Sequence, residues 1–223
     1  MTKTAKAEKK SLIDRFLMIF AKEAVAQDSE LEYMGITKVH LGAFDKNNKF
    51  LKKQSFDVAQ LKEIPDDENE SFTTTVEFDV PAKNGVRIVV LGKEKETDFG
   101  DIATWYGCSV PLNLTAGDIE EVNVYMEHLI EFLEDGEEFN FRFSTETEDN
   151  MTIFKFQWNR VYGVSRYILE YRLDNGPYST INNNSNENCT HSFLSTDGLN
   201  FRFTLEFDFA DIKSEPVDFI DII

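Results

Sequence analysis

Few residues of this chain have the types and spacing that enzyme chemistry requires. Histidine is the usual base at neutral pH, but His40, His128 and His191 stand far apart in the sequence and beside no nucleophile motif. There is no P-loop, no H-E-x-x-H, no G-x-S-x-G elbow and no Rossmann glycine pattern. Adjacent carboxylates arise by chance among 41 acidic residues, so they do not indicate a glycosidase. The sequence therefore predicts a protein that is not an enzyme and has no cofactor.

Two acidic runs, at 66–70 and 98–101, could offer oxygen ligands to Ca²⁺. Neither run has the spaced acids, central glycine and terminal glutamate of an EF-hand. Solvated acidic loops explain both runs better, and a weak, loop-bound Ca²⁺ is the alternative. Zinc is not expected, because the histidines lack ligand spacing.

The two cysteines, Cys108 and Cys189, lie 81 positions apart and outside any CxxC motif. Free cysteine is usually buried, so two unpaired thiols are expected. A disulfide would need the two Cα atoms within about 7 Å. The two residues are expected in different domains, so no disulfide is predicted.

An aromatic pair, Trp105 and Tyr106, follows a polar, glycine-containing loop. Exposed rings of this kind could stack on sugars, which makes the pair a candidate glycan platform. The favoured interpretation is that these rings fill the inner face of a sandwich, because aromatic side chains bury large areas.

Charge narrows the choice of partners. The 41 acidic and 23 basic residues give a formal net charge of −18, which repels phosphate backbones and argues against nucleic-acid binding. The expected partners are a protein or a glycan at the cell surface. At 223 residues, the chain suits one large domain or two small ones.

The N-terminal segment, residues 1–30, is basic at its start and then amphipathic. Leu12, Phe16, Ile19 and Phe20 share one face of an ideal helix, so a docked amphipathic helix is predicted. These four residues are candidates for partner docking, including self-association. An atypical export signal remains open, because 24–26 has the A-x-A pattern, and so does a membrane-surface helix.

Residues 31–132 have the pattern of a first sandwich. From Phe72 to Val80, apolar and polar residues alternate, as in a half-buried strand, and Val86–Leu91 reads as a buried strand. Residues 118–134 are ambiguous: Val122, Val124 and Met126 favour a strand, and a helical reading remains open.

A resemblance supports this first sandwich. The segments 80–83, 87–90, 106–107 and 114–117 place a proline turn, an apolar strand, Tyr-Gly and a Leu-x-Ala-Gly turn in order. This order resembles the immunoglobulin-like sandwiches of bacterial envelope lipoproteins. The N-terminal region has no lipobox cysteine, so a lipid anchor is not carried over.

Residues 133–223 show the strongest alternation. Apolar residues recur at every second position in 139–143, in 154–158 and in 201–209, which predicts half-buried strands and places Trp158 in the core. Residues 182–188 are rich in asparagine and are predicted to form a mobile loop.

The sequence of this second region resembles a fibronectin type III domain. The resemblance rests on 156–158, on the pattern Val161-x-Gly163-x-Ser165-x-Tyr167 with 169–172, on the turn 174–176, and on 214–216 before the last strand. That family generally has a tyrosine where this chain has Phe201, so its corner hydrogen bond is not expected here.

The sequence thus predicts an all-β protein with two tandem antiparallel β-sandwiches, at 31–132 and 133–223, after an N-terminal amphipathic helix. The predicted role is a non-enzymatic structural and interaction protein of the cell envelope or extracellular space. The alternatives are a carbohydrate-binding accessory protein that uses Trp105 and Tyr106, and a surface-filament subunit assembled through the N-terminal segment. No clear signal peptide is present, and a cytoplasmic location is not excluded.

Overall fold

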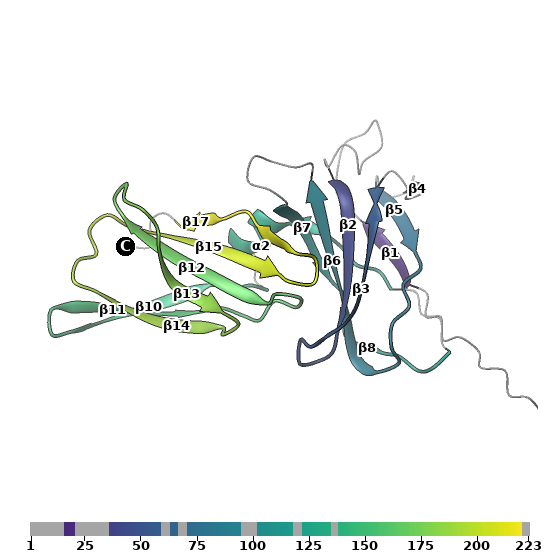
Figure 1. The fold of residues 1–223 in the computed structure, drawn as a ribbon, viewed down its shortest axis with the longest axis horizontal. Coiled ribbons are helices and arrows are strands. Elements are labelled where there is room, and N and C mark those ends of the chain that lie inside the picture. Colours follow the sequence, from purple (N-terminus) through teal and green to yellow (C-terminus); the bar gives the residue numbers. More distant parts are fainter. Residues whose placement is uncertain are drawn as a thin grey trace, which may run out of the picture.

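The computed structural model describes residues 16–20, 36–58, 63–66, 71–94, 102–117, 122–134 and 138–219. In this part of the chain, strands dominate and the one α-helix is six residues long, which confirms the all-β prediction. Figure 1 shows two groups of strands, with β7 and α2 where they meet. The bounds are β1 Phe16–Phe20, β2 Ile36–Phe44, β3 Phe50–Asp57, β4 Glu63–Asp66, β5 Ser71–Val76, β6 Asn84–Glu94, β7 Ile102–Cys108, β8 Leu112–Asn113, β9 Glu127–His128, α2 Leu129–Glu134, β10 Arg142–Glu148, β11 Met151–Gln157, β12 Arg166–Leu173, β13 Ser179–Asn184, β14 Asn188–Phe193, β15 Leu199–Phe207, β16 Ile212–Ser214 and β17 Val217–Phe219.

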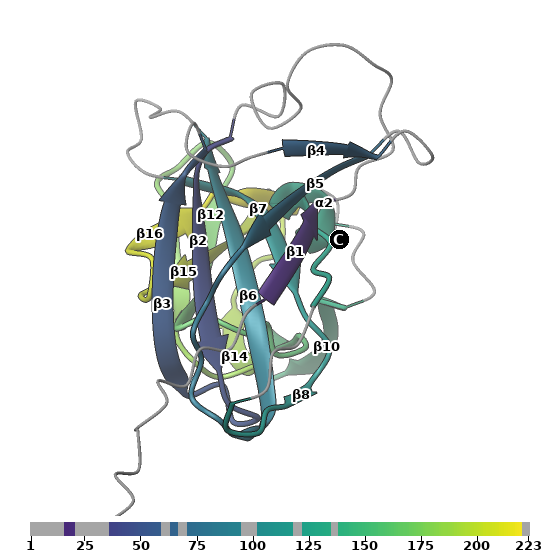
Figure 2. The same ribbon diagram turned by 90° about the vertical axis from the view of Figure 1, so that its right-hand side faces the viewer.

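The first sandwich packs a small sheet against a large one. The small sheet has the order β1-β5-β4, and the strands β7-β6-β2-β3 form the facing layer. Figure 2 shows β1 and β5 lying across the layer that contains β2 and β6. Between the layers lies a core from which water is excluded, to which β2, β6 and the segment after β5 contribute Leu41, Val90 and Phe78, each 0% exposed.

The second sandwich packs the sheet β10-β11-β14 against a sheet built on β13-β12-β15, with β17 paired to β15. The predicted alternation is confirmed: Phe201, Phe203, Leu205 and Phe207 are each 0% exposed. Trp158 is also in this core, with its ring centroid 4.9 Å from that of Phe203. Alternate positions on these strands therefore point into one aromatic interior.

The two sandwiches are joined through one continuous sheet. β16 pairs with β15 on one side and with β7 on the other. The β16–β7 pairing is parallel, with Lys213 opposite Ile102 and Ser214 opposite Ala103. A strand from the end of the chain thus adds to the first sandwich. The domain limits at 31–132 and 133–223 stay predictions.

The predicted N-terminal helix is wrong over Phe16–Phe20, which form β1 and pair antiparallel with β5 from Phe16–Val76 to Phe20–Phe72. Five consecutive apolar residues fit a strand as well as a helix, and the neighbouring strand β5 supplies the backbone hydrogen bonds that decide between them. Leu12 lies outside the described residues.

The ambiguous stretch 118–134 contains both structures. Val122, Val124 and Met126 are buried and alternate with exposed residues, as the strand interpretation predicts, but a paired strand is formed only at Glu127–His128, which is β9. The helix α2 follows at Leu129–Glu134 and buries Leu129, Phe132 and Leu133.

The loop predicted at 182–188 is wrong over most of its length. The asparagine run is mostly strand: β13 extends to Asn184, β14 begins at Asn188, and the buried Asn182 side chain donates to the Tyr167 carbonyl oxygen at 2.7 Å. The loop was predicted because residues 182–188 lack apolar side chains that could anchor them, but the buried hydrogen bond of Asn182 anchors the strand instead. Asp66, the first residue of the acidic run 66–70, lies in β4 rather than in a loop, and 67–70 lie outside the described residues.

Each sandwich contains a Ser-x-Pro segment whose serine hydroxyl bridges two backbone groups, an arrangement that the sequence did not reveal. In Ser109-Val110-Pro111, the Ser109 hydroxyl accepts from Ile88 N–H at 2.9 Å and donates to the Val110 carbonyl oxygen at 2.8 Å. In Ser214-Glu215-Pro216, the Ser214 hydroxyl accepts from Leu205 N–H at 2.9 Å and donates to the Glu215 carbonyl oxygen at 2.9 Å. A short strand, β8 or β17, follows directly after each proline.

Candidate functional site at the junction of the sandwiches

Asn48 connects the two sandwiches through both the nitrogen and the oxygen of its side-chain amide. It lies in the turn between β2 and β3, with a left-handed φ of 61° that asparagine tolerates better than most residues. Its Nδ2 donates to the Val164 carbonyl oxygen at 3.1 Å, and its Oδ1 accepts from Gly163 N–H at 2.8 Å. One side chain therefore satisfies two backbone groups of the second sandwich.

Asp45 holds this turn in place. Its carboxylate accepts from the backbone N–H groups of Asn47 at 2.9 Å and Lys49 at 3.0 Å, and from Lys83 Nζ at 2.7 Å. The hydrogen bond from Lys83, followed by that from Lys49, lowers the pKa of Asp45 to about 2. The turn that presents Asn48 is thus fixed by an ionised carboxylate at neutral pH.

Tyr106 makes a second connection. Its hydroxyl donates to the Tyr162 carbonyl oxygen at 3.2 Å, and burial raises the pKa of Tyr106 well above its usual value, so the phenol stays protonated. Arg87 of β6 places its guanidinium 4.5 Å from the centre of the Tyr162 ring. Both contacts join strands of the first sandwich to the segment before β12.

Close backbone packing is the third connection. Gly163 has a φ of 84°, and a Cβ there would lie 3.1 Å from Val89 Cγ1 and 3.3 Å from Phe209 Cε1. The rings of Phe44 and Phe209 meet edge to face, with centroids 5.3 Å apart. We call these contacts together the junction: the turn 45–49, Arg87, Tyr106, the segment 162–164, Phe44 and Phe209, with the β16–β7 pairing.

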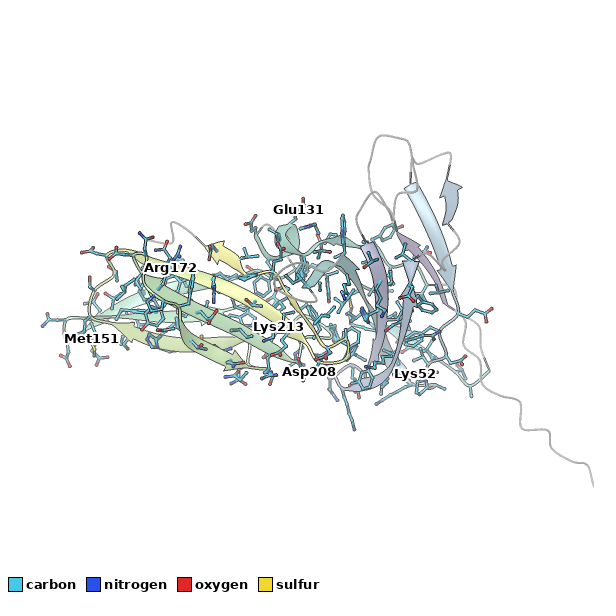
Figure 3. The ribbon with its side chains drawn as sticks, turned by 45° about the horizontal axis from the view of Figure 1, so that its top comes forward. Lys52, Glu131, Met151, Arg172, Asp208 and Lys213 are labelled. Atoms are coloured by element: carbon cyan, nitrogen blue, oxygen red, sulfur yellow. The ribbon has the colours of Figure 1, made fainter. Side chains whose placement is uncertain are left out.

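Two hollows lie beside the junction. The smaller, of about 370 Å³, is lined by Phe44, Val164 and Phe209 and by Phe50, which is 45% exposed. The larger, of about 930 Å³, is lined by the outer face of β12 and β15 and by β16, and we call it the groove. Figure 3 shows Asp208 and Lys213, which line the groove, close to the place where the sandwiches meet.

The groove is acidic, and its charges are partly paired. Glu170 accepts from Arg202 Nε at 2.6 Å, and Glu206 contacts Arg166 at 2.8 Å and Lys213 at 3.5 Å. The acidic side chains that line it outnumber the two basic ones, Arg202 and Lys213: they are Glu170, Glu206, Asp208, Asp211 and Glu215. A surface with this excess of carboxylates attracts cationic groups.

The predicted glycan platform is not on the surface. Trp105 is 7% exposed and belongs to the core of the first sandwich, and Tyr106 is 3% exposed and belongs to the core that continues into the second. Buried rings have no free face for a sugar, so the favoured core interpretation describes both residues, and Tyr106 acts at the junction instead.

Of the predicted docking residues, Phe16, Ile19 and Phe20 lie in β1, and Leu12 lies outside the described residues. Residues 67–70 and 98–101, which the alternative of a loop-bound Ca²⁺ would use, are also outside them. Within the described part of the chain, no group of three or more His, Cys, Asp or Glu side chains could hold a metal ion. The same residues include no helix with the length and hydropathy needed to span a membrane.

Both cysteines are free and half-buried. Burial raises the pKa of Cys108, and it raises the pKa of Cys189 to about 11. The thiolate is the reactive form of cysteine, so both residues are weak nucleophiles at neutral pH.

Sequence reasoning missed Asn48 as a functional residue, although Asn47-Asn48 is a turn signal. Gly163 was recognised only as part of the fibronectin-like pattern. Its partner on the turn before β3 lies 115 positions away, and no local pattern records such a pairing.

No protein-family model matches the chain, and no curated protein matches it. Among solved structures, a fimbrial assembly protein from Parabacteroides distasonis is 11% identical, with 93% of this chain and 85% of that chain covered and a TM-score of 0.34. The fimbrial anchor protein Mfa2 from Porphyromonas gingivalis is 11% identical, with coverages of 93% and 83% and a TM-score of 0.32. A two-domain fibronectin type III segment of chicken tenascin is 11% identical, with coverages of 93% and 97% and a TM-score of 0.26. With every TM-score below 0.5, these likenesses do not bear on the function of this chain.

Proposed function

We propose that the chain is a non-enzymatic structural and interaction protein of the cell envelope or extracellular space, whose two sandwiches form one stiff unit. The observation that carries this proposal is the junction, above all the two hydrogen bonds of Asn48 to Gly163 and Val164. Domains joined only by a linker move relative to each other by default. Here a sheet, a core and side-chain hydrogen bonds all cross between the sandwiches.

The groove is the proposed binding surface. It lies beside the junction, and its lining includes Ile102 of β7 and Lys213 of β16, which lie opposite each other in the β16–β7 pairing. Its excess of carboxylates favours a partner with lysine or arginine side chains. A stiff junction keeps the groove in one shape, which lowers the entropy lost on binding.

A distance measurement between spin labels tests the stiffness. Cysteines introduced as Lys52→Cys and Met151→Cys place labels on the two sandwiches (Figure 3), in a background with Cys108→Ala and Cys189→Ala. The expected distance distribution is a single narrow peak, which broadens when Asn48→Gly and Phe209→Ala are added. A broad distribution in the otherwise unchanged protein would contradict the proposal.

The location is tested on the protein purified from its native cells. An N-terminal residue near Gln27 would support export, since 24–26 has a cleavage-site pattern after a basic start. An intact Met1 together with recovery in the cytoplasmic fraction would refute the envelope location.

One observation favours a second role, a surface-filament subunit. β1 pairs along all five of its residues with β5, so the N-terminal segment can add a strand to a sheet. Purified full-length protein and a variant that lacks residues 1–20 would be compared for assembly by electron microscopy. Filaments formed only by the full-length protein would support this role, and filaments formed equally by both would exclude it.

A further inference from the structure

Among the described strands, none pairs with one edge of β14, and its other edge carries a regular ladder. Among the described strands it pairs only with β11, from Thr152–Phe193 to Gln157–Asn188, with no register shift. Trp158 N–H donates to the Glu187 carbonyl oxygen at 3.0 Å. Bonded and non-bonded pairs alternate along an antiparallel ladder. The N–H and C=O groups of Asn188, Thr190 and Ser192 therefore point away from β11, toward the edge without a described partner strand.

This edge is uncharged in a strongly charged protein. Charged residues make up 29% of the chain, but the 22 residues from Asn175 to Thr196 include a single charged one, Glu187. Glu187 forms an ion pair with Arg160 at 2.7 Å. The edge strands β3, β4 and β10 all carry charged residues, which natural edges use to prevent pairing. β1 is uncharged but follows Asp14 and Arg15 directly.

The neighbouring edge strand β13 is also uncharged, but it is irregular. Its pairing with β12 shifts register between Leu169 and Glu170, so Ile181 is an extra residue on β13. A β-bulge of this kind disrupts the ladder and hinders the addition of another strand. β14 is thus the edge best suited to accept a partner.

We propose that β14 pairs antiparallel with β14 of a second copy of this chain, about a two-fold axis at Thr190. This register places Thr190 opposite Thr190 and Asn188 opposite Ser192, and it uses every outward backbone group in about six hydrogen bonds. Side chains at these three positions are exposed, and Thr–Thr and Asn–Ser pairs can hydrogen-bond across strands.

The β14 edge is the place where two copies of this chain repel each other least. Two chains of formal charge −18 repel each other wherever acidic surfaces meet. At the β14 edge, the nearest charges on β11 and before β12 are neutralised in pairs: Lys155 contacts Glu146 at 2.6 Å, and Arg160 contacts Glu187. The remaining repulsion is long-range, so association should strengthen with salt. The inference does not depend on the role proposed above.

Sedimentation equilibrium of the full-length protein at low and high salt tests the proposal. A reversible monomer–dimer equilibrium is expected, with a dimer dissociation constant that falls as salt rises. Thr190→Lys should raise that constant by about tenfold or more, because two ammonium groups then meet at the axis. Thr190→Pro should do the same without unfolding the protein, since the Thr190 N–H does not bond to β11. Thr180→Lys on β13 makes the same charge change and should have no effect.

Disulfide trapping tests the register in a Cys189→Ala background. Directly opposite bonded residues have Cα atoms about 5.5 Å apart, within the roughly 4.4–6.8 Å that a disulfide spans. Thr190→Cys should therefore form a covalent dimer on mild oxidation. Ser192→Cys should not, because the two positions lie roughly 13 Å apart along the strands. A protein that stays monomeric at high salt, or a dimer that Thr190→Lys leaves intact while Thr180→Lys weakens it, would overturn the proposal.

Discussion

The Oδ1 atom of Asn48 accepts a hydrogen bond from the backbone N–H of Gly163 at 2.8 Å. Both residues have left-handed backbone, with φ of 61° for Asn48 and 84° for Gly163. Glycine adopts this conformation freely, and asparagine adopts it more readily than most other residues. Residue type therefore favours the backbone on both sides of this hydrogen bond, which connects the two sandwiches.

Asn48→Gly is expected to weaken the junction without straining the turn, because glycine accepts the same φ. The loss of two hydrogen bonds should lower the free energy of unfolding by about 1–3 kcal/mol. Denaturant unfolding measures this change. The matched control is Asn150→Gly, at a φ of 68° in the exposed turn between β10 and β11. Equal effects at both positions would mean that the Asn48 amide does not stabilise the junction.

Gly163→Ala and Gly117→Ala separate backbone strain from crowding. Both glycines have positive φ, 84° and 90°, but an added Cβ meets Val89 and Phe209 at Gly163 and nothing within 4 Å at Gly117. Each variant should lose about 1–2 kcal/mol from the left-handed conformation. Gly163→Ala should lose more, by about 1 kcal/mol or above, from overpacking. Denaturant unfolding of both variants measures the two losses of free energy. Equal losses would contradict the predicted crowding at Gly163.

The lowered pKa of Asp45 predicts that the folded protein loses stability in acid. Its pKa is lowered from 3.8 to about 2 in the folded protein, so its contribution is complete above pH 4 and declines as the pH falls toward 2. Asp45→Asn should flatten the dependence of unfolding free energy on pH in this window and lower stability at neutral pH. Asp149→Asn, in the exposed β10–β11 turn, is the control. An unchanged slope in Asp45→Asn would contradict the assignment.

Ser214→Ala leaves the N–H of Leu205 without its acceptor in a buried position, where Ser214 is 3% exposed. The expected loss in unfolding free energy is about 1–3 kcal/mol. Ser109→Ala should cost a similar amount, because Ile88 N–H loses its acceptor in the same way. The exposed Ser179→Ala should change stability by less than about 0.5 kcal/mol. Thermal or denaturant unfolding of the three variants makes the comparison.

Period-two patterns predicted the strands well wherever one face meets a core. Phe154, Phe156 and Trp158 are each buried to within 2% exposure, as the alternation indicated. The prediction works because a strand slipped by one residue would put all three rings in water. The same reasoning placed Val86–Leu91 in a buried strand, which is part of β6.

The errors came where distant partners decide the structure. Phe16–Phe20 has no period of its own, and pairing with β5, more than fifty residues later, makes it a strand. Asn182 looked like a loop residue, yet the Tyr167 carbonyl gives its amide a buried partner. Because Phe201 replaces a tyrosine, no hydrogen bond from a phenol to nearby backbone was expected. A similar bond occurs on another strand, where Tyr167 Oη accepts from Val161 N–H at 2.8 Å.

The core that runs beneath β7 has a thermodynamic consequence. Tyr106 of β7 and Leu129 and Phe132 of α2 share one apolar cluster with Phe139 and with Phe207 of β15. Neither sandwich can melt without exposing rings that belong to the other. Calorimetry of the intact chain should therefore record a single endotherm whose van't Hoff and measured enthalpies agree, although the chain folds into two sandwiches.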